Sequence, residues 1–219
     1  MGEKTQIDIS QCSFDEFITF LFDRDVPAKT QKWNPWYWKV EVTFDPRSVC
    51  TFYVRLFRQP GFLIKRFSKA QLEQGFWAIP SANLGCSVYR LIWDTDLPFA
   101  AREECVKSMV DLFAGLFATE PLDTSVQMWW DSLCYDWHCG TRDRQRGGED
   151  LAMQDVMFLT LSDILALDST ICRGAALHGL GHLHHPDTDQ LVQRYLRQNP
   201  ALSSEARDYA LAAARFEVL

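Results

Sequence analysis

A repeated pattern near the C-terminus places the strongest constraint on how this chain can fold. Its first copy has six positions at offsets of 0, 3, 7, 8, 10 and 13, occupied by Arg173, Ala176, Leu180, Gly181, Leu183 and Pro186. The second copy starts 34 residues later and keeps the first three offsets, with Arg207, Ala210 and Ala214. An amphipathic helix is predicted between the copies from Leu191, Val192, Tyr195 and Leu196. Because one such unit cannot bury its own apolar face, the pattern predicts that at least three units stack.

This pattern resembles the HEAT-like repeats of the short type found in phycobilisome-lyase-related proteins. In those repeats a run of the form Arg-x-x-Ala-x-x-x-Leu-Gly-x-Leu-x-x-Pro forms the first helix and its turn. The resemblance covers residues 170–215, a fifth of the chain of 219 residues. It implies stacked helix pairs and a binding scaffold with a concave surface, and it carries over no catalytic residue.

Apolar stripes at helical spacing, with terminal signals, predict helices over most of the chain upstream. Ser13 and Glu16 form a capping box, and Asp45 precedes a proline at the first helical position. The predicted helices are 13–22, 46–58, 68–77, 98–117, 124–139, 151–165 and 169–184. Residues 36–44 alternate between apolar and polar and predict a short extended segment, so a hairpin over 36–57 stays open beside the helix over 46–58.

These elements together predict a mainly α fold. We expect an irregular stack of helix pairs, resembling an α-α superhelix, with a HEAT-like C-terminal end. The predicted organisation is a single domain, 1–219, with an irregular helical part over 1–139, a mobile loop over 140–150 and a HEAT-like part over 151–219. The loop is predicted because it is the one stretch of low hydrophobicity.

Charge and composition exclude several classes of function. The net charge is −7, from 22 Lys and Arg against 29 Asp and Glu, so a uniformly basic groove for nucleic acid is not expected. No apolar run reaches the roughly 18 residues that a membrane span needs. The seven cysteines follow no export signal, which favours reduced thiols in the cytoplasm. An acidic chain suits a basic protein partner.

Four of the five histidines are clustered near the C-terminal repeat. His178 and His182 are four residues apart, the spacing that presents two imidazoles to one metal ion. His184, His185 or Asp187 could supply the third ligand, and His178, His182 and His185 are the predicted set, with zinc as the ion. The glutamate that acts as general base in zinc proteases is missing from this stretch. The other interpretation is that these histidines are structural and that the chain holds no cofactor.

Cys134, His138 and Cys139 form a second group that could hold zinc, with Cys172 as a further ligand. Cys134 also lies in an apolar stripe, so a buried free thiol is the alternative.

Trp33, Trp36 and Trp38 gather in one segment and form the predicted binding residues. They would offer an aromatic platform, or they would cover the open end of the helix stack. The function expected from the sequence is a non-enzymatic scaffold or adaptor that binds another protein, such as an inhibitor or immunity-type protein. The alternative is a metal-dependent enzyme built on His178, His182, His184 and His185.

Overall fold

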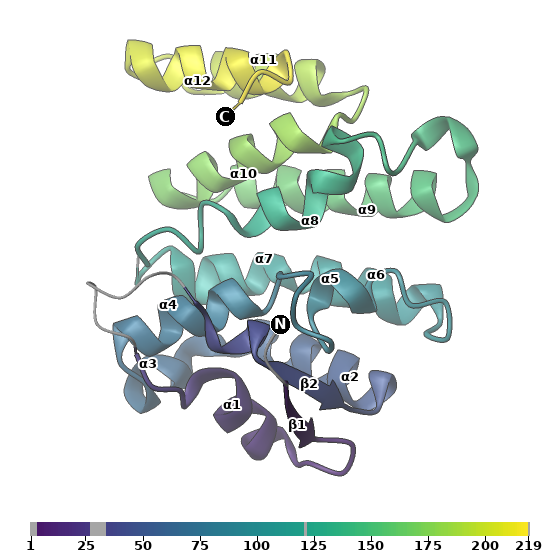
Figure 1. Ribbon diagram of the computed structural model, residues 1–219. Helices are drawn as coiled ribbons and strands as arrows, with labels where there is room; N and C mark the ends of the chain where they lie inside the picture. The colour runs from purple at the N-terminus through teal and green to yellow at the C-terminus, as the bar shows by residue number, and fades with distance from the viewer. Residues whose placement is uncertain (1–3, 27–33, 121, 219) are drawn as a thin grey trace. The chain divides into compact units, whose positions relative to one another are not determined.

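The fold is mainly α, as predicted (Figure 1). A computed structural model describes residues 4–26, 34–120 and 122–218. The chain forms two compact units, the first up to Ser125 and the second from Val126 onward. The sequence predicts one domain with its internal boundary in the loop over 140–150, whereas the structure divides the chain at Ser125.

The first unit contains a small sheet and several helices. Its elements are β1 (Thr5–Asp8), α1 (Phe14–Phe22), β2 (Val40–Thr43), α2 (Pro46–Arg58), α3 (Leu63–Arg66), α4 (Lys69–Ala78), α5 (Val88–Leu91), α6 (Phe99–Lys107) and α7 (Met109–Leu112). Helix α2 packs against α5, α6 and α7, and α1 packs against α4. Their shared core is rich in phenylalanine, including the fully buried Phe17, Phe57 and Phe76.

Local capping signals set several helix starts correctly. The capping box at Ser13 is present, and the Asp45 carboxylate accepts a hydrogen bond from the Ser48 backbone N–H at 2.9 Å. The predicted extended segment is in part correct, because 36–38 is a short 3-10 helix and 40–43 is β2. A hairpin over 36–57 does not form, since β2 pairs in parallel with β1, with Thr5 opposite Val40, and 46–58 is helix α2.

Two predicted helix boundaries are wrong. The stripe over 98–117 is broken into α6, α7 and a π turn at Phe113–Phe117. The helix predicted from residue 124 begins only at Trp129. This late start has a cause in tertiary structure. The Glu73 carboxylate accepts hydrogen bonds of 2.9 Å from the backbone N–H groups of Asp123, Thr124 and Ser125, and these bonds hold the segment as a turn.

The described part of the second unit contains five α-helices. They are α8 (Trp129–His138), α9 (Gly148–Leu165), α10 (Thr170–Leu183), α11 (Thr188–Gln198) and α12 (Ser204–Ala214). Helix α10 lies at the centre and packs against α8, α9 and α12, while α11 packs against α12 (Figure 1). The predicted helix over 169–184 is confirmed, since Ser169 caps α10 and His184 ends it in a left-handed conformation.

Two glycines let other segments approach α10 closely. A Cβ at Gly179 would lie inside van der Waals contact with Trp130 of α8 and 2.9 Å from Leu161 Cδ2 of α9. Gly181 also lies inside α10, and a Cβ there would clash with Val218. These glycines are therefore packing residues that determine how close the neighbouring helices come.

The loop predicted over 140–150 is held by ion pairs rather than free. Arg142 lies 3.2 Å from Asp136 of α8 and 2.9 Å from Asp150 of α9. Arg144 pairs with Asp155, and a short 3-10 helix occupies Arg144–Arg146. Arg142 therefore connects α8 to α9.

All seven cysteines are free thiols. In the part of the chain that the structure describes, no helix has the length and apolar character needed to cross a membrane.

Candidate metal centre

Helices α8 and α10 bring three metal-ligating side chains together in the second unit. His178 and His182 lie one turn apart on α10, and Asp131 faces them from the first turn of α8. One donor atom from each residue lies within 4.8 Å of the other two. This is the one such group of three found among the described residues.

Histidine nitrogens of this group are left without hydrogen bonds. His182 Nε2 lies 3.1 Å from Asp131 Oδ1, yet neither ring nitrogen of His182 makes a hydrogen bond. His178 Nε2 is also buried and unpartnered. Leaving a buried polar atom unpaired costs about 1–3 kcal/mol, so such atoms call for an explanation. Two ligands of one tetrahedral zinc ion lie roughly 3.3 Å apart, close to the separation between His182 and Asp131.

Burial keeps both imidazoles neutral at pH 7. The residues His178 and His182 are only 2% and 6% exposed. Burial lowers the pKa of His178, and it lowers the pKa of His182 from 6.5 to about 4, although the nearby Asp131 opposes the shift. A neutral imidazole has a free lone pair, which is the form that binds a metal ion.

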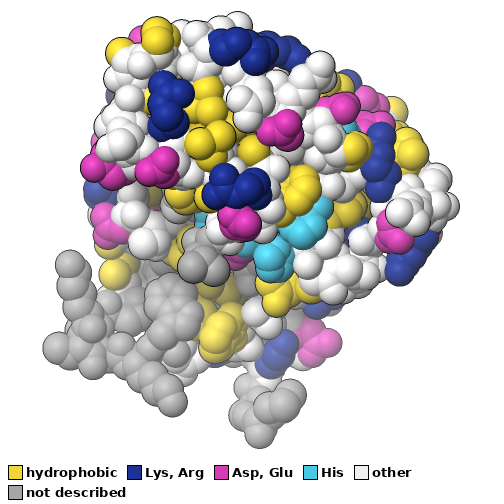
Figure 2. Space-filling model, turned by 90° about the horizontal axis from the view of Figure 1, so that it is seen from above, with side chains coloured by type: hydrophobic (Ala, Val, Ile, Leu, Met, Phe, Trp, Pro, Cys, Tyr) yellow, Lys and Arg dark blue, Asp and Glu magenta, His cyan; other side chains and the backbone are white. Residues whose placement is uncertain are grey.

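One side of the group opens to solvent. The Asp131 side chain is 27% exposed, unlike the two buried histidines. The exposed His138 lies beside it, with its ring centroid 4.8 Å from that of His182, and His184 follows at 5.4 Å from His138. Figure 2 shows histidine side chains gathered at one place on this face of the molecule.

The structure does not bring His185 to His178 and His182, so the predicted ligand set changes. His185 Nε2 lies 2.9 Å from Asp155, its Nδ1 accepts from the Asp187 backbone N–H, and its ring stacks on Phe158. Both ring nitrogens are thus occupied. The cause is the end of α10 at His184, which takes His185 off the helix face of the other two. Asp187 serves as the N-terminal flank of α11.

The cysteine group predicted around Cys134 does not assemble. Burial raises the pKa of the Cys134 thiol well above its usual value, helped by Asp131, so the thiol stays protonated and is a poor ligand. Cys139 is exposed and contacts Thr141. Sequence reasoning missed Asp131, although it lies on the same face of α8 as Cys134 and His138, three and seven residues before them.

The structure describes two of the three tryptophans predicted to bind a partner, Trp36 and Trp38. Trp33 lies outside the described residues. Trp36 packs edge-to-face on Phe20, and the Arg24 guanidinium lies 4.3 Å from its ring centroid. Trp38 is 44% exposed.

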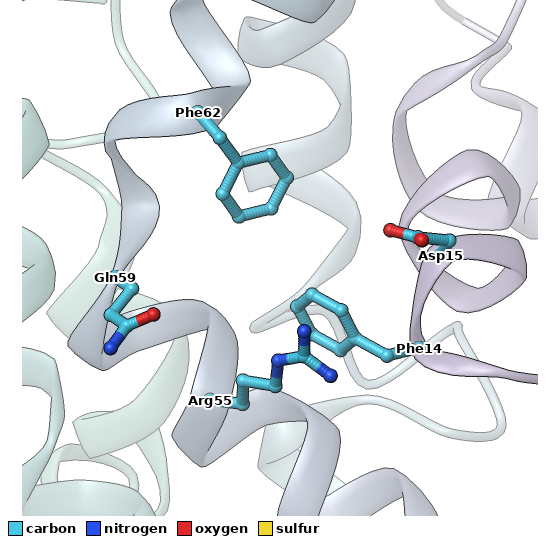
Figure 3. A pocket seen from close by; sticks show the side chains of 5 residues that line it. All are labelled: Phe14, Asp15, Arg55, Gln59 and Phe62. Carbon is cyan, nitrogen blue, oxygen red and sulfur yellow. The ribbon is translucent and has the colours of Figure 1, made fainter.

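A separate hollow of about 290 Å³ lies in the first unit (Figure 3). It is lined by Phe14, Asp15, Arg55, Gln59 and Phe62. Its two charged side chains already have partners: the Arg55 guanidinium lies 4.0 Å from the Phe14 ring centroid, and Asp15 lies 3.5 Å from Arg66. The group on α8 and α10 is therefore the stronger candidate for a functional site.

Comparisons with known proteins return no match: no family model, no curated protein and no solved structure is significantly similar to this chain.

Proposed function

We propose that the second unit binds one divalent transition-metal ion of the zinc class through Asp131, His178 and His182. The observation that carries this proposal is the set of buried, unpartnered nitrogens on the two histidines, next to a carboxylate oxygen. One cation could bind one nitrogen of each histidine together with the carboxylate oxygen. Nitrogen and oxygen ligands of this kind are typical of zinc sites.

Three protein ligands leave a tetrahedral ion with one position for an exogenous ligand. The partial exposure of Asp131 supports a solvent-accessible position for that ligand. Such open sites activate a bound water or polarise a substrate, whereas structural zinc sites use four protein ligands. The proposed function is thus a metal-dependent enzyme, the alternative that the histidine spacing raised.

The proposal is tested by metal analysis of protein purified without an affinity tag. We expect about one zinc ion per chain in the wild type, and less than about a tenth of that in D131N and H182A, since each variant removes a ligand. H185A is the matched control, because His185 is bonded to Asp155 and should not be needed. Zinc absent from the wild type, or lost in H185A but kept in D131N, would overturn the proposed site.

Four expectations from the sequence stay predictions: the protein-binding scaffold, its basic partner, the HEAT-like resemblance and the cytoplasmic location. The exposed large apolar side chains of the described residues include Val26, Trp38, Ile64, Tyr135, Leu151, Leu159 and Ile171. They come from several different elements of both units, and apolar side chains exposed singly are normal on soluble proteins.

A further inference from the structure

One hydrogen bond leads from the candidate metal centre to the last helix, and a second joins that helix to the segment before α8. His178 Nδ1 lies 2.8 Å from the Tyr209 hydroxyl oxygen, and Tyr209 belongs to α12. Gln127, in the segment before α8, donates from Nε2 to the same oxygen at 3.3 Å. The hydroxyl therefore connects three segments: the start of the second unit, α10 and α12.

Whether His178 or Tyr209 donates the hydrogen bond between them depends on whether Nε2 of His178 carries a proton or a metal ion. A neutral imidazole has one N–H and one lone pair, so a metal ion on Nε2 requires the proton on Nδ1. In that form Nδ1–H donates to Tyr209, whose oxygen can accept this bond as well as the one from Gln127. In the opposite form Tyr209 donates to Nδ1, and a buried Nε2–H then points at a site where it has no hydrogen-bond partner.

We infer that Tyr209 is a positioning residue for the metal centre, which holds His178 in the tautomer that presents Nε2 to the ion and thereby couples metal binding to the docking of α12. This inference rests on the proposed function. Partners of this type orient metal-bound histidines in many proteins, and their removal weakens metal affinity by about 10–100-fold. Because coupling is reciprocal, a bound ion must also stabilise the α12 contact.

The test compares two tyrosine-to-phenylalanine variants in zinc titrations of metal-free protein. Y209F removes the hydroxyl on His178 and should weaken zinc binding by about 10–100-fold. Y195F is the matched control, because Tyr195 lies on α11 in the same unit and its hydroxyl forms no hydrogen bond with the described residues. We expect Y195F to bind zinc as the wild type does.

A second readout separates positioning from simple loss of stability. Nitrogen-15 chemical shifts of His178 report its tautomer, and hydrogen exchange reports the docking of α12. In the wild type, zinc should fix the Nδ1–H form and slow exchange in α12, while in Y209F zinc should slow exchange in α12 less than it does in the wild type. Equal zinc affinity and equal α12 protection in Y209F and wild type would overturn the inference alone. A wild type that binds no zinc would remove the proposed function and this inference together.

Discussion

At the level of single residues, burial determines the protonation state of the two histidines proposed as ligands. Desolvation disfavours the imidazolium form, and the neighbouring carboxylate of Asp131 offsets only part of this effect. The folded protein without metal therefore holds neutral histidines at pH values where an unfolded chain would protonate them. This difference makes folding stability depend on pH.

The metal-free protein should lose stability as the pH falls below 6.5. There the unfolded chain binds a proton on His182 that the folded protein does not bind until the pH nears 4. The folded pKa is the lower one, so the free energy of unfolding declines across this window, by on the order of 1–3 kcal/mol for one such group. Chemical denaturation at pH 7, 6 and 5 with a chelator present measures the change.

The control for this pH dependence is H182Q, whose side chain does not titrate. We expect H182Q to show a flatter decline between pH 7 and 5 than the wild type. If both proteins lose stability equally over this range, His182 is not the group responsible, and its burial as a neutral imidazole is not supported.

At the level of secondary structure, the contact between helices α8 and α10 creates the candidate site. Asp131 meets His178 and His182 only because these helices lie close together, and Gly179 allows this approach beside Trp130. An alanine at this position would push α8 away from α10. The site and the packing of this helix pair therefore depend on the same residue.

We expect G179A to destabilise the second unit by about 1–3 kcal/mol, since its Cβ would overpack against Trp130 and Leu161. It should also weaken zinc binding by moving Asp131. G174A is a matched control in the same helix, because its Cβ would meet only Gln127 Oε1 at 3.6 Å. Thermal unfolding and zinc titration of both variants test this; equal stability of G179A and G174A would contradict the packing argument.

Features that depend on neighbouring residues could be predicted from the sequence, whereas contacts between distant segments could not. Helix starts at Ser13 and Asp45 depend on residues within one turn, and both are confirmed. The His178–His182 spacing is equally local. Asp131 lies 47 residues from His178 in the sequence, so its approach depends on packing between helices and has no local signal. His185 lies off the helix face of His178 and His182, because the left-handed residue His184 ends the helix one position earlier.

Glu73 shows the same limit in the first unit. The residues from Asp123 to Ser125 have the composition of a helix start, but their backbone N–H groups bond to a carboxylate about 50 residues earlier. A distant acceptor therefore replaces the local cap, and the helix begins later than its sequence pattern indicates.

The whole molecule consists of two compact units, and only the second contains the candidate metal centre. A ligand that binds only the folded form stabilises it by about 2.7 kcal/mol at 100 times its Kd, and this gain belongs to the unit that holds the site. We expect zinc to slow hydrogen exchange in peptides from 126–218 and to leave 4–26 and 34–120 unchanged. Equal protection in both units would contradict a site confined to the second unit.

The most direct measurement is an anomalous difference map at the zinc edge, from crystals of zinc-loaded protein. The account predicts one peak about 2.0–2.2 Å from an Asp131 oxygen and from Nε2 of both His178 and His182. A peak bound by His185 without Asp131, or no peak in this unit, would contradict it.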